Sequence, residues 1–555
     1  MTRTGLLVTS YKDVALTNDY PESTWIAMDY LITQLFPKKE FQYFFKNKTY
    51  SNDLNYIPYK IAHNWYRDNK GIDISSGPYS VGMVLEHRLN YILSNLINYY
   101  YAFKYWVNKN DIIYVPKTNN TFFNILCDNF IDNIKYINGN YEISPQIDIF
   151  IKNKCTIRPV NIKKKSYIAK LIQKMLFIKN TNKVMVFPDW TYKSLKHKNY
   201  IYFNSYNLFN GFYMDNNPNT ETIVNDSISK IPEISNTLDD IICQSFPNDD
   251  IEPFASLIKQ NIQYEYINAI KNTNRIFSLF TDVISTYKPK SIVIPDYGIS
   301  PWYNIIAQIA EQHNIKLYSV IDGFHIFMQS WTLKKNRKGN NNLIKNFASM
   351  GSMNDSFLKK YISHDNVINI QTPLANNLEI KKNTDIIYDA IILMPYCWNS
   401  VNADDDKRYK YLFDVIKVLK SININKIAIK FKEGKVIGPN DTGEKIVTEQ
   451  LINLNKYKNI SLISGSFSDY VNKTKIVIGQ VGTSLIESVI CETPYFLYEP
   501  IENGLYDYNF INSMICDKSY AKNISDLKKN ILSNNCVELV KDKIVDGKSI
   551  NLVIN

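Results

Sequence analysis

The chain has 555 residues, of which 45% are hydrophobic and 21% are charged. This composition is ordinary for a soluble globular protein, and it excludes a disordered chain, a collagen-like fibre and a disulfide-stapled miniprotein. The net charge of +11 favours anionic partners. Because Lys, Asn, Ile and Tyr are all abundant together, a coding bias explains much of this charge, and it is weak evidence for such a partner. At roughly 100–200 residues per domain, two or three domains are expected.

Seven Cys residues are scattered along the chain without a C-x-x-C pair. This pattern is typical of a reducing compartment and excludes a zinc ribbon. The N-terminal apolar run is too short for a signal peptide, and no stretch reaches the about 18 apolar residues that span a bilayer. We expect a cytoplasmic protein. Peripheral contact with the inner face of the membrane stays open, because residues 163–179 fit either an amphipathic surface helix or a solvated connecting helix.

Strand and helix patterns alternate from the N-terminus onward. An apolar strand is predicted at Gly5–Ser10, a polar loop at Tyr11–Glu22 and an amphipathic helix at Ser23–Phe36. The same succession returns with a strand at Asp111–Val115 and a helical pattern at Thr121–Ile134.

The middle of the chain is less regular. Residues 138–183 are rich in Lys and Asn and fit a connection or an insertion. Strands are predicted at Lys183–Pro188 and Asn199–Phe203, followed by a loop at Asp215–Pro232. A long helical region then covers Ile251–Tyr287.

From Ser291 onward the alternation is clear and indicates a parallel sheet covered on both faces. The predicted strands are Ser291–Pro295, Lys316–Ile321, Asp389–Pro395, Lys426–Phe431, Ile460–Ile463, Lys475–Ile478 and Tyr495–Tyr498. The predicted helices are Trp302–His313, Arg408–Ser421, Glu444–Leu454, Thr483–Cys491 and Ile524–Ser533.

These patterns predict an α/β fold with two Rossmann-like domains that face each other across a cleft, with extra helical segments in the N-terminal half. We expect the N-terminal domain to cover residues 1–380 and the C-terminal domain to cover residues 385–555. Open α/β sheets bind ligands beyond the carboxyl ends of their strands. The segments after the predicted strands are therefore the places where a site is expected.

The sharpest signal is Lys475–Pro500, with the sequence KIVIGQVGTSLIESVICETPYFLYEP. A buried strand leads through Gln480 and Gly482 into a helix that opens at Thr483–Ser484, and Glu487 comes one turn later. Glycine lets the backbone approach a ligand, and a helix N-terminus suits a phosphate. For the turn by itself, a capped helix of any α/β protein is an equally good interpretation.

The run G-Q-x-G-T-S-L-I-E-S-x-x-x-x-x-P-Y-F-L-Y-E-P resembles the donor-binding region of GT-B glycosyltransferases. It is most similar to bacterial enzymes of surface and capsular polysaccharide biosynthesis, over roughly Ser291–Asn535. The resemblance implies that the Gly/Ser/Thr turn holds the nucleotide phosphate and that the next acid contacts the sugar or ribose. The candidates for donor binding in this segment are Gln480, Gly482, Thr483, Ser484, Glu487 and Glu499.

Two further donor-site candidates, Lys430 and Lys432, stand at the end of a predicted strand and on one face of it. They could neutralise the phosphate of a leaving group. A solvated basic edge in a Lys-rich protein explains the same pattern. Related transferases often carry His-Pro at this strand end, whereas this chain has Lys-Glu-Gly, which leaves the type of nucleotide open.

Candidates for a catalytic base lie after two other predicted strands. Asp296 comes directly after one strand, and Asp322 and His325 come after the next, where the resembled family commonly has His-Gly. A carboxylate or an imidazole could deprotonate an acceptor hydroxyl there. Capping of the next turn explains the two Asp residues as well, and a lone His is more often structural. Asp19, in the loop after the first strand, is the alternative base.

No phosphate-loop, zinc-helix or nucleophile-elbow motif occurs in the sequence. The acidic run Asp404–Asp406 fits the start of a helix, where negative charge is favourable. We therefore predict a metal-independent enzyme without a cofactor, with the nucleotide sugar as co-substrate.

The resulting functional prediction is a glycosyltransferase that moves a sugar from a nucleotide-activated donor to a glycan or lipid-linked glycan acceptor. The donor is expected on the C-terminal domain and the acceptor on the N-terminal domain. Transfer of a CMP-linked acidic sugar of the Kdo or sialic type, polyol-phosphate transfer and sugar-nucleotide epimerisation stay open. A non-catalytic glycan- or nucleotide-binding scaffold is the alternative of another class. No nucleic-acid partner is expected, because Lys is spread out and no recognition module appears.

Overall fold

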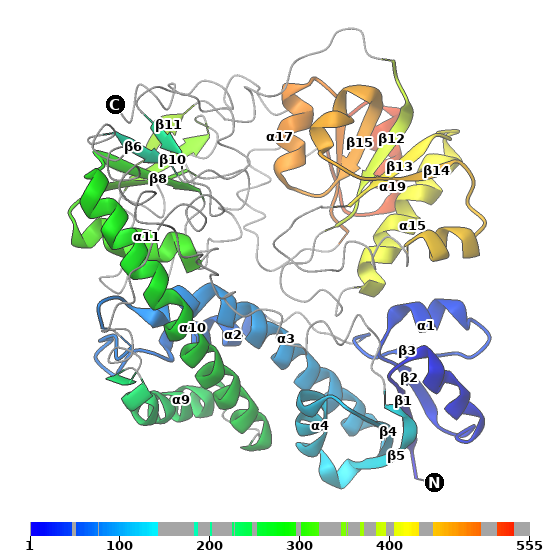
Figure 1. Cartoon of the computed structure of the whole chain (residues 1–555). Helices are drawn as coiled ribbons and strands as arrows, with labels where there is room; N and C mark the ends of the chain where they lie inside the picture. Colours follow the sequence, from blue (N-terminus) through cyan, green and yellow to red (C-terminus); the bar gives the residue numbers. More distant parts are fainter. Residues whose placement is uncertain are drawn as a thin grey trace, which may run out of the picture.

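The computed structural model describes residues 2–46, 52–75, 77–141, 183–186, 200–202, 225–226, 228–246, 252–295, 301–320, 346–350, 352, 367–370, 385–395, 405–431, 448–500 and 519–537. These residues form three sheets with helices between the strands (Figure 1). The strand pairs within the sheets are parallel, so each connection must cross back over its sheet. The predicted α/β fold with parallel sheets is confirmed.

The first sheet has the order β3-β2-β1-β4-β5. Its strands are β1 (Thr4–Val8), β2 (Thr24–Ala27), β3 (Gln42–Tyr43), β4 (Ile112–Thr118) and β5 (Ile134–Tyr141). Its helical segments are η1 (Tyr11–Asn18), α1 (Tyr30–Leu35) and α4 (Thr121–Asp128).

The helix predicted at Ser23–Phe36 is wrong in its first half. The segment TWIA forms strand β2, which pairs with β1 in the register Leu6↔Trp25, and only α1 is helical. The periodicity of Ser23–Phe36 suits a helix, but pairing with β1 completes the buried sheet and overrides this local preference. The predicted loop after β1 likewise contains the 3-10 helix η1.

Long helices pack together beside the first sheet and account for the predicted extra helical segments (Figure 1). They are α2 (Asn52–Asn64), α3 (Val81–Lys109), α9 (Ile231–Ser245) and α10 (Glu252–Tyr287). An ion pair joins α3 to α10, with 2.8 Å between Arg88 Nε and Glu265 Oε2. The Glu265 side chain is 1% exposed, so its charge needs this partner.

The second sheet has the order β11-β10-β9-β8-β6-β7. Its strands are β6 (Val184–Val186), β7 (Tyr200–Tyr202), β8 (Ser291–Pro295), β9 (Lys316–Val320), β10 (Asn346–Met350) and β11 (Val367–Ile370), and α11 (Pro301–Gln312) joins β8 to β9. The sequence patterns did not separate this sheet from the first one, because pairing partners are not encoded locally.

The third sheet has the order β14-β13-β12-β15-β16-β17 and lies in the C-terminal part of the chain. Its strands are β12 (Tyr388–Leu393), β13 (Ile427–Lys430), β14 (Ile460–Ile463), β15 (Thr474–Gly479), β16 (Tyr495–Tyr498) and β17 (Tyr520–Ala521). Its helices include α15 (Asp405–Ser421), α17 (Thr483–Ile490) and α19 (Ile524–Leu532). Counted along the chain, this is the Rossmann order 3-2-1-4-5-6.

The first sheet contacts the third through α1 and α15 (Figure 1). The rings of Tyr30 and Tyr409 stack with 5.7 Å between centroids and 3° between planes, and Leu31 joins the apolar core of the C-terminal part. Helix α1 comes after the carboxyl end of β2. The start of α15 lies at the carboxyl end of β12, because Arg408 Nε donates to Pro395 O at 3.1 Å. The carboxyl edges of these two sheets therefore meet at this contact.

Candidate functional site

The third sheet reverses its direction of growth between β12 and β15. From β12 the chain builds outward through β13 and β14, and then returns to add β15 on the other side of β12. Connections leave such a reversal on opposite faces of the sheet and open a crevice beyond the carboxyl ends of the two strands. The segment that the sequence motif singles out, from β15 into α17, begins at this place.

The turn between β15 and α17 starts with a glycine that packing requires. A Cβ atom on Gly479 would collide with the Tyr495 hydroxyl and would lie 2.9 Å from Leu393 Cδ1. Tyr495 Oη also donates to the Gln480 carbonyl at 2.5 Å. Gly479 therefore makes room for a tyrosine that holds the turn, and a ligand is not needed to explain it.

Gly482, unlike Gly479, is not required by packing against the described residues. Its φ of 179° is extended backbone that any residue adopts, and none of the residues that the structure describes lies within 4 Å of a Cβ atom placed there. The fold therefore does not demand glycine at this position. The open space lies directly at the start of α17, where Gly482 is the N-cap.

Glu499 and Gln480 lie together and brace the same turn. Glu499 Oε1 accepts from the Val481 amide at 2.8 Å, and Oε2 accepts from Gln480 Nε2 at 3.0 Å. Glu499 is 3% exposed. Because both of its oxygens are occupied by the turn, the structure gives Glu499 a role in holding the turn.

Helix α17 presents its N-terminus to the open space. Gly482 offers no side chain to cap the first amides, and Thr483 and Ser484 are half-buried. The first turn carries no acidic residue. Uncapped amides and the positive end of the helix dipole together attract an anion.

Lys430 and Glu487 add two buried charged groups to this edge. Lys430 ends β13 with 6% exposure, and its Nζ donates to Phe431 O at 2.6 Å. Glu487, one turn into α17, is 9% exposed. Burial raises the pKa of Glu487 to about 7, while the charge of Lys430 acts to lower it and that of Asp469 to raise it. A carboxyl with this pKa can either donate or accept a hydrogen bond near neutral pH.

Two residues that were not among the sequence candidates also bear on this site: Asp469 through its charge, which acts on Glu487, and Tyr495 through its hydrogen bond to the turn. Asp469 lies in η8 (Phe467–Asp469) and forms a capping box with Ser466. The pattern S-x-x-D is a sequence signal for such a box. The role of Tyr495 has no comparable local signal, because it depends on a glycine on the neighbouring strand.

The remaining sequence candidates lie either on the first sheet or outside the described residues. Asp19 is exposed at the end of η1 on the first sheet, apart from the donor-site group. In the same loop, Asp13 is fully buried and accepts from Thr9 Oγ1 and Ser10 Oγ, each at 2.8 Å, and from the Asn140 amide at 3.1 Å. Asp13 thus ties β1 to β5. The candidates that lie outside the described residues are Asp296, Asp322, His325 and Lys432.

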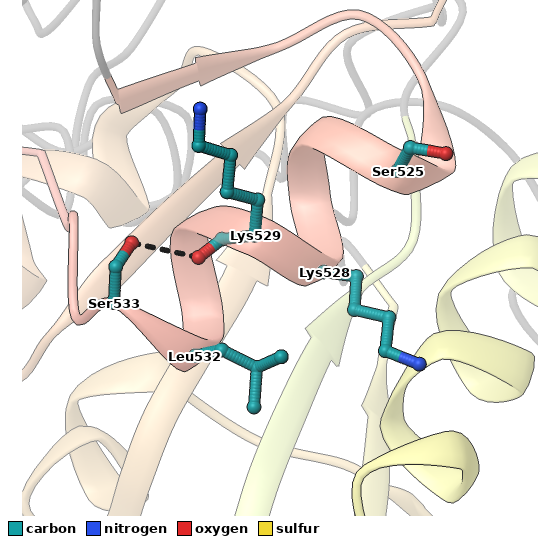
Figure 2. A pocket seen from close by; sticks show the side chains of 5 residues that line it. All are labelled: Ser525, Lys528, Lys529, Leu532 and Ser533. Carbon is teal, nitrogen blue, oxygen red and sulfur yellow. Dashed lines mark hydrogen bonds between the residues drawn. The ribbon is translucent and has the colours of Figure 1, made fainter.

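A hollow on the outer face of α19 offers no comparable site. Its lining comes from a single helix, and the ammonium groups of Lys528 and Lys529 point in different directions (Figure 2). Ser533 Oγ is engaged with the Lys529 carbonyl at 2.7 Å. An anion held there would therefore meet one lysine at most.

The described part of the chain lacks two features. Within those residues, no group of three or more His, Cys, Asp or Glu side chains is arranged to hold a metal ion. Among the helices that the structure describes, none combines the length and apolar character required to cross a bilayer.

Comparisons with known proteins give only distant likenesses. No protein-family model matches the sequence, and no curated protein matches it. The structure is similar to the UDP-GlcNAc 2-epimerase of Methanocaldococcus jannaschii, with a TM-score of 0.39, 12% identity, and coverage of 66% of this chain and 98% of that chain. It is also similar to a glycosyltransferase from Rickettsia africae, with a TM-score of 0.33, 12% identity, and coverage of 70% and 91%. At these scores the site must be interpreted from its own geometry.

Proposed function

We propose that the protein is a glycosyltransferase whose nucleotide-sugar donor binds at the carboxyl edge of the third sheet. The observation that carries this proposal is the reversal between β12 and β15, where α17 begins without a side-chain cap. Lys430, which ends β13 on the other side of β12, acts on Glu487 of this helix through its charge. A helix N-terminus and a buried ammonium together suit a diphosphate. The resemblance of Lys475–Pro500 to GT-B donor sites supports the same assignment.

The donor-site residues take distinct roles in this proposal. The amides of Thr483 and Ser484 contact the phosphates, and Lys430, with Lys432 two residues later, neutralises the charge that develops on the leaving group. Gly482 leaves room for the ligand. Glu487 contacts the sugar or ribose.

The acceptor side of the proposal rests on the sequence. Residues 1–380 are proposed to bind a glycan or lipid-linked glycan acceptor, and residues 385–555 the donor. Asp296, Asp322 or His325 would deprotonate the acceptor hydroxyl, with Asp19 as the alternative. The contact of Tyr30 with Tyr409 joins the first sheet to the third. It supports an arrangement in which acceptor and donor meet where the carboxyl ends of the strands of these two sheets face each other.

Binding is tested first, by isothermal titration of UDP, GDP, CMP, dTDP, CDP-glycerol and UDP-GlcNAc into the full chain. We expect one nucleotide class to bind and Lys430→Met to weaken it at least tenfold, because a charge-assisted hydrogen bond contributes about 1.5–3 kcal/mol. Lys475→Ala is the matched control: Lys475 sits near the amino end of β15, paired with Asp389 at 2.8 Å. Equal affinity in both variants, or no binding at all, would overturn the proposed donor site.

The reaction is tested next, with the donor that binds and a panel of glycan acceptors. Release of the nucleotide together with glycosylated product supports the transferase. Conversion of the donor sugar without an acceptor would indicate epimerisation. CMP as the preferred nucleotide would favour an acidic sugar, and CDP-glycerol would favour polyol-phosphate transfer. Binding without turnover of any donor would indicate a non-catalytic scaffold.

A further inference from the structure

Glu487 stands in an unusual position for an acid beside an anion site. It lies four residues after Thr483, so the two side chains share one face of α17. Helical side chains point back toward the N-terminus of their helix. The Glu487 carboxyl is therefore directed toward the turn where the proposed phosphate binds, and it is only 9% exposed.

The charged groups around Glu487 come from several elements. Lys430 at the end of β13 is the cation, and Asp469 in η8 is a second acid. Glu499 after β16 is engaged by Val481 and Gln480, and Asp469 Oδ2 accepts from the Ser466 amide at 3.2 Å. Asp469 is exposed, whereas Glu487 is buried. An entering diphosphate would thus bring further negative charge close to a buried carboxyl group. Like charges at short range in such surroundings favour protonation of one partner.

We propose that an anionic nucleotide sugar binds at the N-terminus of α17 together with one proton, which Glu487 takes up from solvent. Glu487 then enters the complex as a neutral acid, and its hydroxyl donates a hydrogen bond that a carboxylate could not offer. Because Glu487 is then neutral, the ammonium group of Lys430 interacts with the phosphates alone. This inference rests on the proposed donor site and specifies the protonation state in which that site binds its ligand.

The test uses UDP-GlcNAc, or whichever nucleotide sugar of the panel binds, because its phosphates are diesters that do not titrate near neutral pH. Titration calorimetry at pH 6, 7 and 8, in buffers of different ionisation enthalpy, counts the protons taken up on binding. With the pKa of free Glu487 near 7, we expect close to one proton at pH 8, little at pH 6, and an affinity about tenfold lower at pH 8.

Glu487→Gln replaces the neutral acid by an amide that can also donate. We expect this variant to bind with the same affinity at pH 6 and pH 8 and to take up no proton, whereas Lys475→Ala keeps the pH dependence of the wild type. Proton counting on the wild type needs no variant, so the test survives if Glu487→Gln fails to fold.

The outcomes separate this inference from the proposed function. Binding by the wild type with no proton uptake at pH 8, or a pH dependence that persists in Glu487→Gln, overturns the inference and leaves the donor site standing. Absence of binding by every nucleotide sugar at pH 6 overturns both.

Discussion

At the scale of single residues, burial decides what the acids of the third sheet do. Glu499 and Glu487 are both nearly inaccessible, with 3% and 9% exposure. Glu499 accepts two hydrogen bonds from the β15–α17 turn, which compensate its burial. Burial is the largest influence on the pKa of Glu487 and raises it to about 7. The charge of Lys430 acts to lower this pKa, and that of Asp469 acts to raise it.

The raised pKa of Glu487 makes stability depend on pH with a definite sign. The folded state holds this proton more tightly than the unfolded state, so the free energy of unfolding falls as pH rises from about 4.5 to about 7 and is then flat. Glu487→Gln removes this effect. We expect the stability of the variant relative to wild type to rise by about 2–3 kcal/mol between pH 5 and pH 8.

Urea unfolding of both proteins at pH 5, 6, 7 and 8 measures this difference. Glu449→Gln makes the same substitution at an exposed position and is the control. A constant difference for Glu487→Gln would contradict the prediction.

At the scale of elements, the turn from β15 into α17 is positioned by its neighbours in the sheet. Tyr495 on β16 fills the space above Gly479 and bonds to Gln480, and Glu499 fixes Val481. The N-terminus of α17 is thereby held in place before any ligand arrives, which lowers the cost of binding.

Substitution by alanine should affect the stability of the protein differently at the two glycines of this turn. Gly479→Ala forces a methyl group into Tyr495 and Leu393, and we expect it to lower the free energy of unfolding by about 1–3 kcal/mol. Gly482→Ala adds a methyl group that meets no described residue within 4 Å, so we expect stability within about 0.5 kcal/mol of wild type. In the proposed donor site, Gly482→Ala should nevertheless weaken nucleotide binding. Thermal unfolding and titration calorimetry separate the two effects; similar losses of stability in both variants would be the contrary result.

At the scale of the whole molecule, three parallel sheets share one chain, and two of them meet at their carboxyl edges. The meeting point is the contact of α1 with α15, where Tyr30 stacks on Tyr409 and Leu31 enters the C-terminal core. Tyr11 begins η1 and is 36% exposed. Partial burial and the nearby Asp29 and Tyr409 raise its pKa above the ordinary value, so this residue lies beside the same contact.

A double-mutant cycle of Tyr30→Ala and Tyr409→Ala tests whether this contact stabilises the molecule. We expect a coupling free energy of about 0.5–1.5 kcal/mol, the range for stacked aromatic pairs. Tyr409→Phe keeps the ring and should retain most of the coupling. Additive effects of the two Ala substitutions would show that the sheets do not cooperate through this pair.

The sequence by itself determined the α/β class, most strands of the second and third sheets and the strand–turn–helix segment at Gln480–Glu487. It did not yield the short strands β10, β11 and β17. The features that it determined are local: an apolar run bounded by glycine or proline predicts a buried strand, and a 3.6-residue periodicity predicts a helix. The donor-site candidates from Lys430 to Glu487 were proposed for the same reason, because strand ends are visible in the sequence.

Only the tertiary structure decided that Thr24–Ala27 is a strand, that the N-terminal half holds two sheets, and that Glu499 braces a turn. These outcomes depend on partners far away in the chain: β1 for β2, and Val481 for Glu499. The same holds for Gly479, whose neighbour Tyr495 lies on another strand. Local patterning reports whether a segment can be buried, whereas pairing between distant segments fixes what buries it, and that pairing exists only in the folded chain.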